Sequence, residues 1–299
     1  MMNYQLNRFP ESIAMTHSMS ETINDYDVYI LDLWGVLYDG GGLYPGVLEC
    51  LTKLKQASKI ICLLSNAPRL ATDIEADLKK NGLTRDHFDH IMTSGQFTHD
   101  FLQSEERQTY FPGDRFYFIG ADRHVSLFSS LPLTQVEHPK DADFVLTCGT
   151  RDFSHSLTDY QDELALCASY NLPMICANPD KYVMNAGKRV ICAGLLAQHY
   201  STLKQRVQYF GKPYTIIYDA IHEFFPDIER DRMLMVGDSF ETDVKGGFHA
   251  DIDVALISGG VHSEDLKIDW GQMPEEGLVI GLCEKYDLWP RYVLPTFTW

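Results

Sequence analysis

Three apolar segments of this chain end in polar side chains of the kinds that handle phosphate groups and metal ions. In open α/β folds, ligands bind at the carboxyl ends of parallel strands. A single aspartate at such a place usually caps a helix. Several strand ends of this kind, however, predict one shared site. The polar residues at the three ends are Asp32, Ser65, Asn66 and Asp238.

Each of these residue types has a task in phosphoryl transfer. The carboxylate of Asp32 can attack phosphorus and carry the phosphoryl group as an aspartyl phosphate. Ser65 and Asn66, with backbone N–H groups at the start of a helix, can hold phosphate oxygens. Lys212, in "FGKPY", can neutralise charge on the nucleophile and on the phosphate. Together they indicate a phosphoryl-transfer site.

The segment "GDSFETD" supplies two further carboxylates. Carboxylate oxygens from Asp32 and Asp238 suit Mg²⁺, which keeps several waters and takes few protein ligands. Asp243 could hold one of those waters. We therefore expect Mg²⁺ as the cofactor of this site.

Short apolar strands alternate with amphipathic helices along the chain, which is typical of a parallel α/β sheet. Pro45 in the first turn of one predicted helix and Gly82 at the end of the next are ordinary helix-boundary residues. The predicted strands cover residues 28–31, 59–64, 115–120, 143–149, 172–177, 233–237 and 253–258, and the predicted helices cover residues 45–57, 69–82, 157–170, 213–225 and 241–249.

The same alternation recurs in the middle third of the chain, which indicates a second α/β unit inserted into the first. The core domain is predicted to comprise residues 1–93, with an N-terminal extension at 1–24, and to resume at 211–299. Residues 94–210 form the predicted insertion. The fold class is thus α/β, a Rossmann-like doubly wound parallel-sheet core with an inserted α/β domain.

The composition and net charge of the chain disfavour nucleic acids and membranes as partners. The chain has 299 residues, 45% of them hydrophobic, and a formal net charge of −17, which repels nucleic acid and anionic membrane surfaces. No apolar segment approaches the length of a membrane span, and the first residues lack the design of a signal peptide. The seven cysteines form no CxxC pair and lie mostly in apolar segments, which favours buried reduced thiols and a cytoplasmic location.

The ordered set Asp32, Ser65, Lys212 and "GDSFETD" resembles the four motifs of the haloacid dehalogenase superfamily of hydrolases. The insertion between the second and third motifs is similar to the α/β cap of its class IIA branch, which includes nitrophenyl phosphatases and sugar- or nucleotide-phosphate phosphatases. The resemblance continues in "GVLYDGGGLYPG", "LLSNAPR", "CGTRDFSH" and "ANPD", and it covers nearly the whole chain beyond about residue 25.

The resemblance implies several further properties. The substrate is a small phosphorylated metabolite, and the backbone carbonyl of Trp34 joins Asp32, Asp238 and Asp243 in holding Mg²⁺. In the cap, Arg151 and Asp180 are implied to contact the substrate, although a turn and a helix cap in a surface loop explain these residues equally well. Relatives of this branch often pair through the cap, which would make the protein a homodimer.

The sequence departs from the family pattern at Trp34, where phosphatases of this superfamily usually carry the aspartate that protonates the leaving group. General acid–base catalysis is worth about 10²–10⁴-fold, so the change weakens catalysis without abolishing it. Haloacid dehalogenases resemble this chain in having an aromatic residue, a tyrosine, at that place. They lack the paired acids of the last motif, whereas this chain retains Asp238 and Asp243.

Three functions follow from this departure. The first is an Mg²⁺-dependent phosphatase that accepts good leaving groups or borrows a proton donor, such as Asp39, Asp180 or a substrate hydroxyl. The second is a catalytically weakened relative that binds a phosphorylated ligand without efficient turnover. The third is a dehalogenase-like hydrolase. The retained metal ligands favour the phosphatase.

Overall fold

The computed structural model describes residues 13–185 and 188–299. The first twelve residues of the predicted N-terminal extension lie outside these ranges. The chain divides into two compact units, each of which is discontinuous in sequence. The first unit holds the described residues up to Ser65 together with Glu75–Met92 and Tyr218–Trp299, and the second holds Asn66–Ile74 and Thr93–Ile217. Among the described residues, no helix combines the length and the apolar character needed to span a bilayer.

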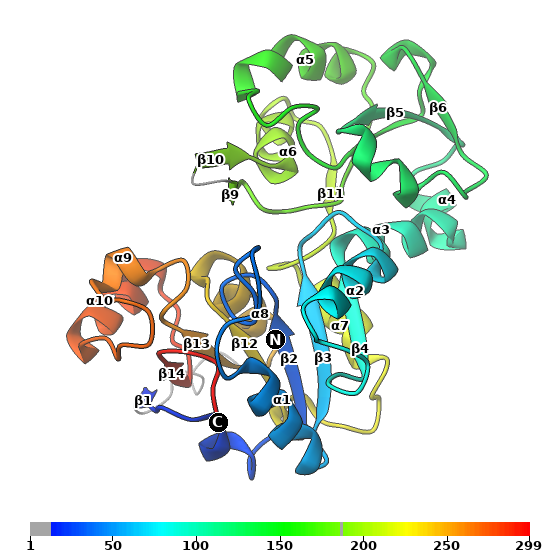
Figure 1. Cartoon of the computed structure of the whole chain (residues 1–299). Helices are drawn as coiled ribbons and strands as arrows, with labels where there is room; N and C mark the ends of the chain where they lie inside the picture. Colours follow the sequence, from blue (N-terminus) through cyan, green and yellow to red (C-terminus); the bar gives the residue numbers. More distant parts are fainter. Residues whose placement is uncertain (1–12, 186–187) are drawn as a thin grey trace, which may run out of the picture. The chain divides into compact units, whose positions relative to one another are not determined.

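The first unit is organised around a seven-stranded sheet with strand order β1-β14-β13-β12-β2-β3-β4 (Figure 1). Strand β2 lies between β3 and β12 and is parallel to both. All five of its residues are buried, because helices cover both faces of such a sheet. The strands are β1 (Ala14–Met15), β2 (Val28–Asp32), β3 (Ile60–Ser65), β4 (His90–Thr93), β12 (Met233–Gly237), β13 (Asp253–Ile257) and β14 (Tyr292–Leu294).

The sheet is doubly wound around β2. From β2 the chain adds β3 and then β4 in one direction, whereas β13 and β14 extend from β12 in the other. Because crossovers between parallel strands are nearly always right-handed, this order is expected to place the helices of the two halves on opposite faces. The strand order reverses between β2 and β12, which is the place where such folds bind ligands. The helices that connect these strands are α1 (Val47–Gln56), α2 (Ala71–Lys80), α7 (Thr215–His222), α8 (Lys245–His249), α9 (Ser263–Leu266) and α10 (Glu276–Tyr286).

The second unit has its own five-stranded parallel sheet, with strand order β11-β8-β7-β5-β6. Neighbouring residues of β7 enter two different hydrophobic clusters, Phe144 and Leu146 in one and Val145 in the other, so both faces of this sheet are covered. Its elements are α3 (Ser94–Gln103), α4 (Glu105–Tyr110), β5 (Arg115–Ile119), β6 (Thr134–Val136), β7 (Phe144–Thr147), α5 (Gln161–Ser169), β8 (Met174–Cys176), the hairpin β9 (Tyr182–Asn185) and β10 (Lys188–Ile191), α6 (Ala193–Thr202) and β11 (Val207–Tyr209).

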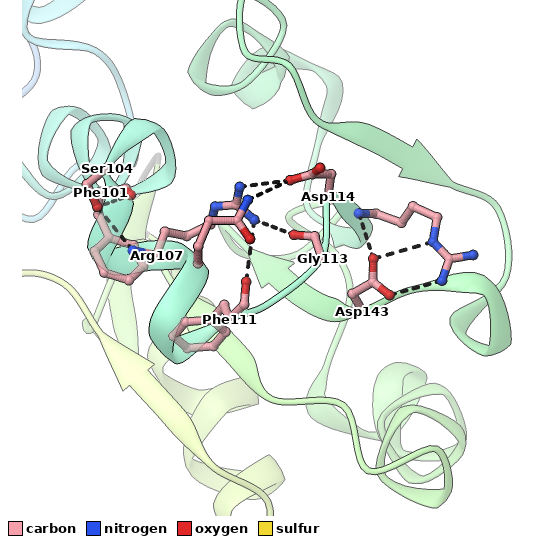
Figure 2. A network of polar contacts seen from close by, with 9 residues as sticks. Phe101, Ser104, Arg107, Phe111, Gly113, Asp114 and Asp143 are labelled. Carbon is pink, nitrogen blue, oxygen red and sulfur yellow. Dashed lines mark hydrogen bonds and ion pairs between the residues drawn. The ribbon is translucent and has the colours of Figure 1, made fainter.

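A buried arginine fastens α4 to the start of β5 (Figure 2). The guanidinium of Arg107 donates to the carbonyl of Gly113 and, at 2.8 Å, to the carboxylate of Asp114. One strand further, Asp143 accepts the backbone N–H of Arg115 at 3.0 Å and also pairs with its guanidinium. These contacts fasten together the amino-terminal ends of β5 and β7.

The structure confirms the predicted fold class, an α/β protein with a parallel-sheet core and a second α/β unit. It also confirms seven free, buried cysteines. The predicted start of α1 was wrong. The helix begins at Val47, because the preceding Gly46 adopts a φ of +85° as the N-cap and leaves Pro45 outside. The domain boundaries read from the sequence stay a prediction.

Candidate active site

Three carboxylates meet in the first unit. Oxygen atoms of Asp32, Asp238 and Asp243 all lie within 4.8 Å of one another, and within the described ranges this is the one group of at least three potential metal ligands so arranged. Asp32 and Asp238 are each 8% exposed and Asp243 is fully buried. Three buried carboxylates at such distances repel one another strongly unless a cation lies between them.

The sheet register explains how residues so far apart in sequence come together. Asp32 ends β2 opposite Leu64 on β3, one residue before Ser65. On the other side, Leu31 pairs with Val236 of β12, so Asp238 follows two positions later. Because the three strands are parallel neighbours, their carboxyl ends lie at one edge of the sheet. The predicted convergence of Asp32, Ser65 and Asp238 at this edge agrees with this register.

Asp243 is positioned by an unusual helical turn. The prediction placed residues 241–249 in one helix, but the structure forms a π-helical turn over Phe240–Val244 before α8 begins. Within this turn the Oδ2 of Asp243 accepts the backbone N–H groups of Asp238 at 3.2 Å and Ser239 at 3.1 Å. The wider turn therefore directs the carboxylate back toward the end of β12, as π turns often do at functional sites.

Two glycines give Asp238 its place, and sequence reasoning missed both of them. Gly35 has a φ of +78°, and a Cβ there would lie 1.9 Å from the Oδ2 of Asp238. A Cβ at Gly260 would lie 2.3 Å from the same oxygen. The next residue, Val261, donates its backbone N–H to this Oδ2 at 2.8 Å. The segment that contains Trp34 and the loop after β13 thus both pack directly on Asp238.

His262 is a third residue that the sequence analysis did not find. Its side chain is buried, and its Nε2 accepts the backbone N–H of Phe240 at 3.2 Å, at the start of the turn that carries Asp243. The ring of Phe240 stacks on Tyr286 of α10 at 5.0 Å. The signal in the sequence was "GGVH", which follows the predicted strand 253–258 as the other polar ends follow theirs.

A second group of predicted site residues lies in the second unit. The side-chain amide of Asn66 accepts the backbone N–H of Lys212 at 2.7 Å and donates to its carbonyl at 3.0 Å. The same amide donates to Asp180 at 2.8 Å. Lys212 is 2% exposed. The structure therefore brings together Asn66, Asp180 and Lys212, three residues from distant parts of the chain, whereas Ser65 belongs to the first unit.

Arg151 lies elsewhere in the second unit, in an ion pair that the sequence did not predict. Its guanidinium donates to Glu163 of α5 at 2.8 Å, and the Tyr117 hydroxyl donates to the same carboxylate at 2.6 Å. Burial alone would raise the pKa of Glu163, but these two hydrogen bonds outweigh it and hold the pKa below its ordinary value. Arg151 also lines a cavity of about 320 Å³ together with Tyr117, Phe118, Gly120, Ala121, Asp122, Gln135, Val136 and Glu137.

The predicted contact of Arg151 with substrate can be separated from its ion pair. We expect Arg151→Ala to raise the KM for nitrophenyl phosphate by about tenfold, because a charge-assisted hydrogen bond to the phosphate is lost. Glu163→Gln breaks the same ion pair and keeps the arginine, so it should lower the melting temperature and leave the KM within twofold. Steady-state kinetics and thermal unfolding of both variants make the comparison. A KM that stays at the wild-type value in both variants would show that Arg151 serves only the stability of the second unit.

Comparison with known proteins places the chain in a family. A family model described as haloacid dehalogenase-like hydrolase matches residues 29–134, and a second, described as HAD-hydrolase-like, matches residues 209–280. The ribonucleotide monophosphatase NagD of Escherichia coli (strain K12) is 28% identical over 240 residues, which are 79% of this chain and 89% of that protein.

Solved structures agree with this placement. A haloacid dehalogenase-like family hydrolase from Brucella suis 1330 has a TM-score of 0.78 at 28% identity, with 94% of this chain and 99% of that chain covered. The 4-nitrophenylphosphatase of Thermotoga maritima shares the fold, with a TM-score of 0.68 at 24% identity over 91% of this chain and 95% of its own. The chain therefore belongs to the haloacid dehalogenase superfamily of hydrolases, and within it to the class IIA phosphatases.

Proposed function

We propose that this protein is an Mg²⁺-dependent phosphatase that hydrolyses a small phosphorylated metabolite through an aspartyl phosphate on Asp32. The observation that carries the proposal is the buried cluster of Asp32, Asp238 and Asp243, whose oxygens lie within 4.8 Å of one another. Relatives named for the hydrolysis of phosphate esters, such as ribonucleotide monophosphatase and dihydroxyacetone phosphatase, support the substrate class.

The donor set fits Mg²⁺. All three side chains offer hard carboxylate oxygens, and the family pattern adds the backbone carbonyl of Trp34. Asp32 and Asp238 would bind the ion directly, and Asp243 would orient a bound water. When bound, the ion supplies positive charge that offsets the charge of the transferred phosphoryl group. Without a cation the buried carboxylates would repel both the phosphate and one another.

The reaction then proceeds in two displacements at phosphorus. A carboxylate oxygen of Asp32 forms a bond to phosphorus while the bond from phosphorus to the leaving oxygen breaks. Water then attacks the phosphorus of the aspartyl phosphate, which releases inorganic phosphate and restores the carboxylate. Ser65 and Asn66 are assigned to the phosphate oxygens. Lys212 is assigned to neutralise their charge.

The weakened relative that binds phosphate without efficient turnover remains the second candidate, because Trp34 occupies the place of the usual acid. The distinction needs one assay. Nitrophenyl phosphate hydrolysis is measured with Mg²⁺ and with chelator, and Asp32→Asn serves as the blank. A rate that requires both Mg²⁺ and Asp32 is the expected result. A rate equal to the blank, with thermal stabilisation by phosphate plus Mg²⁺, would favour the binding protein, and activity indifferent to chelator would favour a dehalogenase-like hydrolase.

The remaining assignments follow from the same family placement. We propose that residues 94–210 form the cap and that residues 1–93 and 211–299 form the core. The two family models support an insertion, because they leave residues 135–208 between them unmatched. Pairing through the cap and a cytoplasmic location stay predictions. The seven free buried cysteines suit a reducing compartment.

A further inference from the structure

Four aromatic rings of the first unit lie in two contacting pairs. The indole of Trp34 meets Tyr38 edge-on with ring centroids 5.2 Å apart. The ring of Tyr44 stacks on Trp270 at 5.7 Å and an interplanar angle of 20°. The side chain of Trp34 is 47% exposed, which is unusual for the largest apolar residue. We refer to these four residues as the aromatic wall.

Residues adjoining the aromatic wall pack on the carboxylate of Asp238. The backbone of Gly35, the neighbour of Trp34, packs on the carboxylate of Asp238. Burial raises the pKa of the Tyr44 phenol, and nearby carboxylates, among them that of Asp238, raise it further. Trp270 lies 3.6 Å from the Cβ position of Gly259, the residue before the glycine that abuts Asp238. Each pair of rings is therefore linked to Asp238 through neighbouring glycines, Trp34 through Gly35 and Trp270 through Gly259 and Gly260.

The loop after β2 is built to hold the indole in one place. Gly40 has a φ of +93°, and a Cβ there would lie 2.6 Å from the Cη2 of Trp34, so only glycine lets the backbone approach the ring. Backbone bridges join Tyr38 to Trp34 and to Leu43, and the hydroxyl of Tyr38 donates to the carbonyl of Gly40 at 2.9 Å. One edge of the indole is thus fixed against the loop, and much of the remaining ring faces solvent.

The same loop offers no ready acid in place of the missing aspartate. Apart from Asp32 itself, Asp39 is the carboxyl group nearest to Trp34 in the sequence, but its Oδ1 accepts the backbone N–H groups of Gly41 at 2.7 Å and Gly42 at 2.9 Å. These hydrogen bonds lower the pKa of Asp39, so it is ionised at neutral pH and carries no proton to give. The indole N–H of Trp34 is a donor that does not release its proton.

From the aromatic wall and the glycines that link it to Asp238 we infer that the substrate is a phosphate ester of a hydroxyl on an aromatic ring, and that Trp34 binds the leaving ring by stacking. The inference rests on the proposed phosphatase function and specifies its leaving group. When Asp32 attacks, the bond from phosphorus to the aryl oxygen breaks and its electron pair stays on that oxygen. The phenolate that leaves is stabilised by its ring, so the step needs no general acid.

The first test compares leaving groups at the holoenzyme with Mg²⁺. Phenyl phosphate has an aromatic leaving group, acetyl phosphate has an acidic leaving group without a ring, and glycerol phosphate has neither property. We expect kcat/KM for phenyl phosphate to exceed that for glycerol phosphate by at least about 10²-fold. This factor is the lower end of the rate enhancement that a general acid typically supplies. Equal rates on the aryl and alkyl esters would overturn the inference, because the chain would then possess a proton donor.

The second test assigns the ring contact to Trp34. In Trp34→Leu the ratio of kcat/KM for phenyl phosphate to that for acetyl phosphate should fall about five- to tenfold, and Trp34→Phe should recover most of it. The ratio cancels any effect of the substitution on steps common to both substrates. Competitive inhibition by phenylphosphonate relative to methylphosphonate should lose the same factor. A ratio unchanged in Trp34→Leu would overturn the role of the indole.

These outcomes differ from a failure of the proposed function itself. If no ester is turned over in a manner that requires Mg²⁺ and Asp32, the phosphatase proposal fails. In that case the preference for phenylphosphonate over methylphosphonate, measured by thermal stabilisation in the wild type and in Trp34→Leu, still tests the aromatic wall. Loss of the preference in the variant would support a binding site for aromatic phosphate esters, and no preference in the wild type would refute it.

Discussion

Replacing Asp32 with asparagine is expected to lower kcat for nitrophenyl phosphate by at least about 10⁴-fold. The amide is close to the carboxylate in shape, but it is a far weaker nucleophile and forms no aspartyl phosphate. It also removes one of the three charges that lie within 4.8 Å of one another. An acid quench during turnover should recover phosphorylated protein from the wild type and none from Asp32→Asn.

Asp39→Asn is the matched control for this change. Asp39 lies in the loop that follows the proposed nucleophile, is exposed, and accepts the backbone N–H groups of Gly41 and Gly42. Asparagine can still accept these hydrogen bonds, so kcat should stay within about threefold of the wild type, as for most surface substitutions. A comparable loss in both variants would mean that Asp39 donates a proton. Turnover of Asp32→Asn within tenfold of the wild type would exclude the aspartyl-phosphate route.

The second large effect is expected at Asp243, where two substitutions separate metal binding from folding. Asp243→Ala removes a fully buried carboxylate that accepts two backbone N–H groups. Each group left without a partner costs about 1–3 kcal/mol, so the free energy of unfolding should fall measurably. Asp243→Asn keeps an acceptor oxygen in that place and removes only the charge, which leaves the free energy of unfolding closer to that of the wild type.

Metal dependence gives the complementary measurement. Both variants should need about 10–100-fold more Mg²⁺ for half-maximal activity, the usual result when a group that orients a metal ligand is lost. Denaturant unfolding and Mg²⁺ titration of the two proteins test the pair of expectations. The assignment would be wrong if Asp243→Asn kept the wild-type Mg²⁺ requirement, because the charge would then have no part in holding the ion.

The strand ends of the site could be predicted because each strand has a recognisable pattern in its own local sequence. An apolar run that stops at Asp32 or Asp238 indicates a buried parallel strand, and parallel strands place their ends at one edge. The contacts that aim the side chains could not be predicted in this way. Gly35 and Gly260 approach Asp238 from segments more than 200 residues apart, and no local pattern reports such a meeting.

For the same reason, the sequence did not predict the partners of several side chains. Arg151 was singled out by a motif, but its ion pair depends on how the loop after β7 meets α5, where Glu163 lies. Asn66 was assigned to the phosphate from its place after a strand, and the pattern gave no sign that its amide also ties Lys212 and Asp180 together. The fit of Gly40 against Trp34 depends on the fold of the whole loop. Sequence patterns identify chemical groups, and packing decides which atoms they meet.

The buried cysteines have a consequence for following how the protein opens. Burial raises the pKa of every one of these thiols, and the pKa values of Cys62 and Cys176 rise to about 12. The seven thiols are therefore protonated, and they are inaccessible in the folded state. A thiol reagent would therefore react only when the surrounding structure opens. The first unit contains Cys50, Cys62 and Cys283, and the second contains Cys148, Cys167, Cys176 and Cys192. Alkylation followed by peptide mapping would thus measure the rate at which each unit opens, and the native cysteines would serve as the probes.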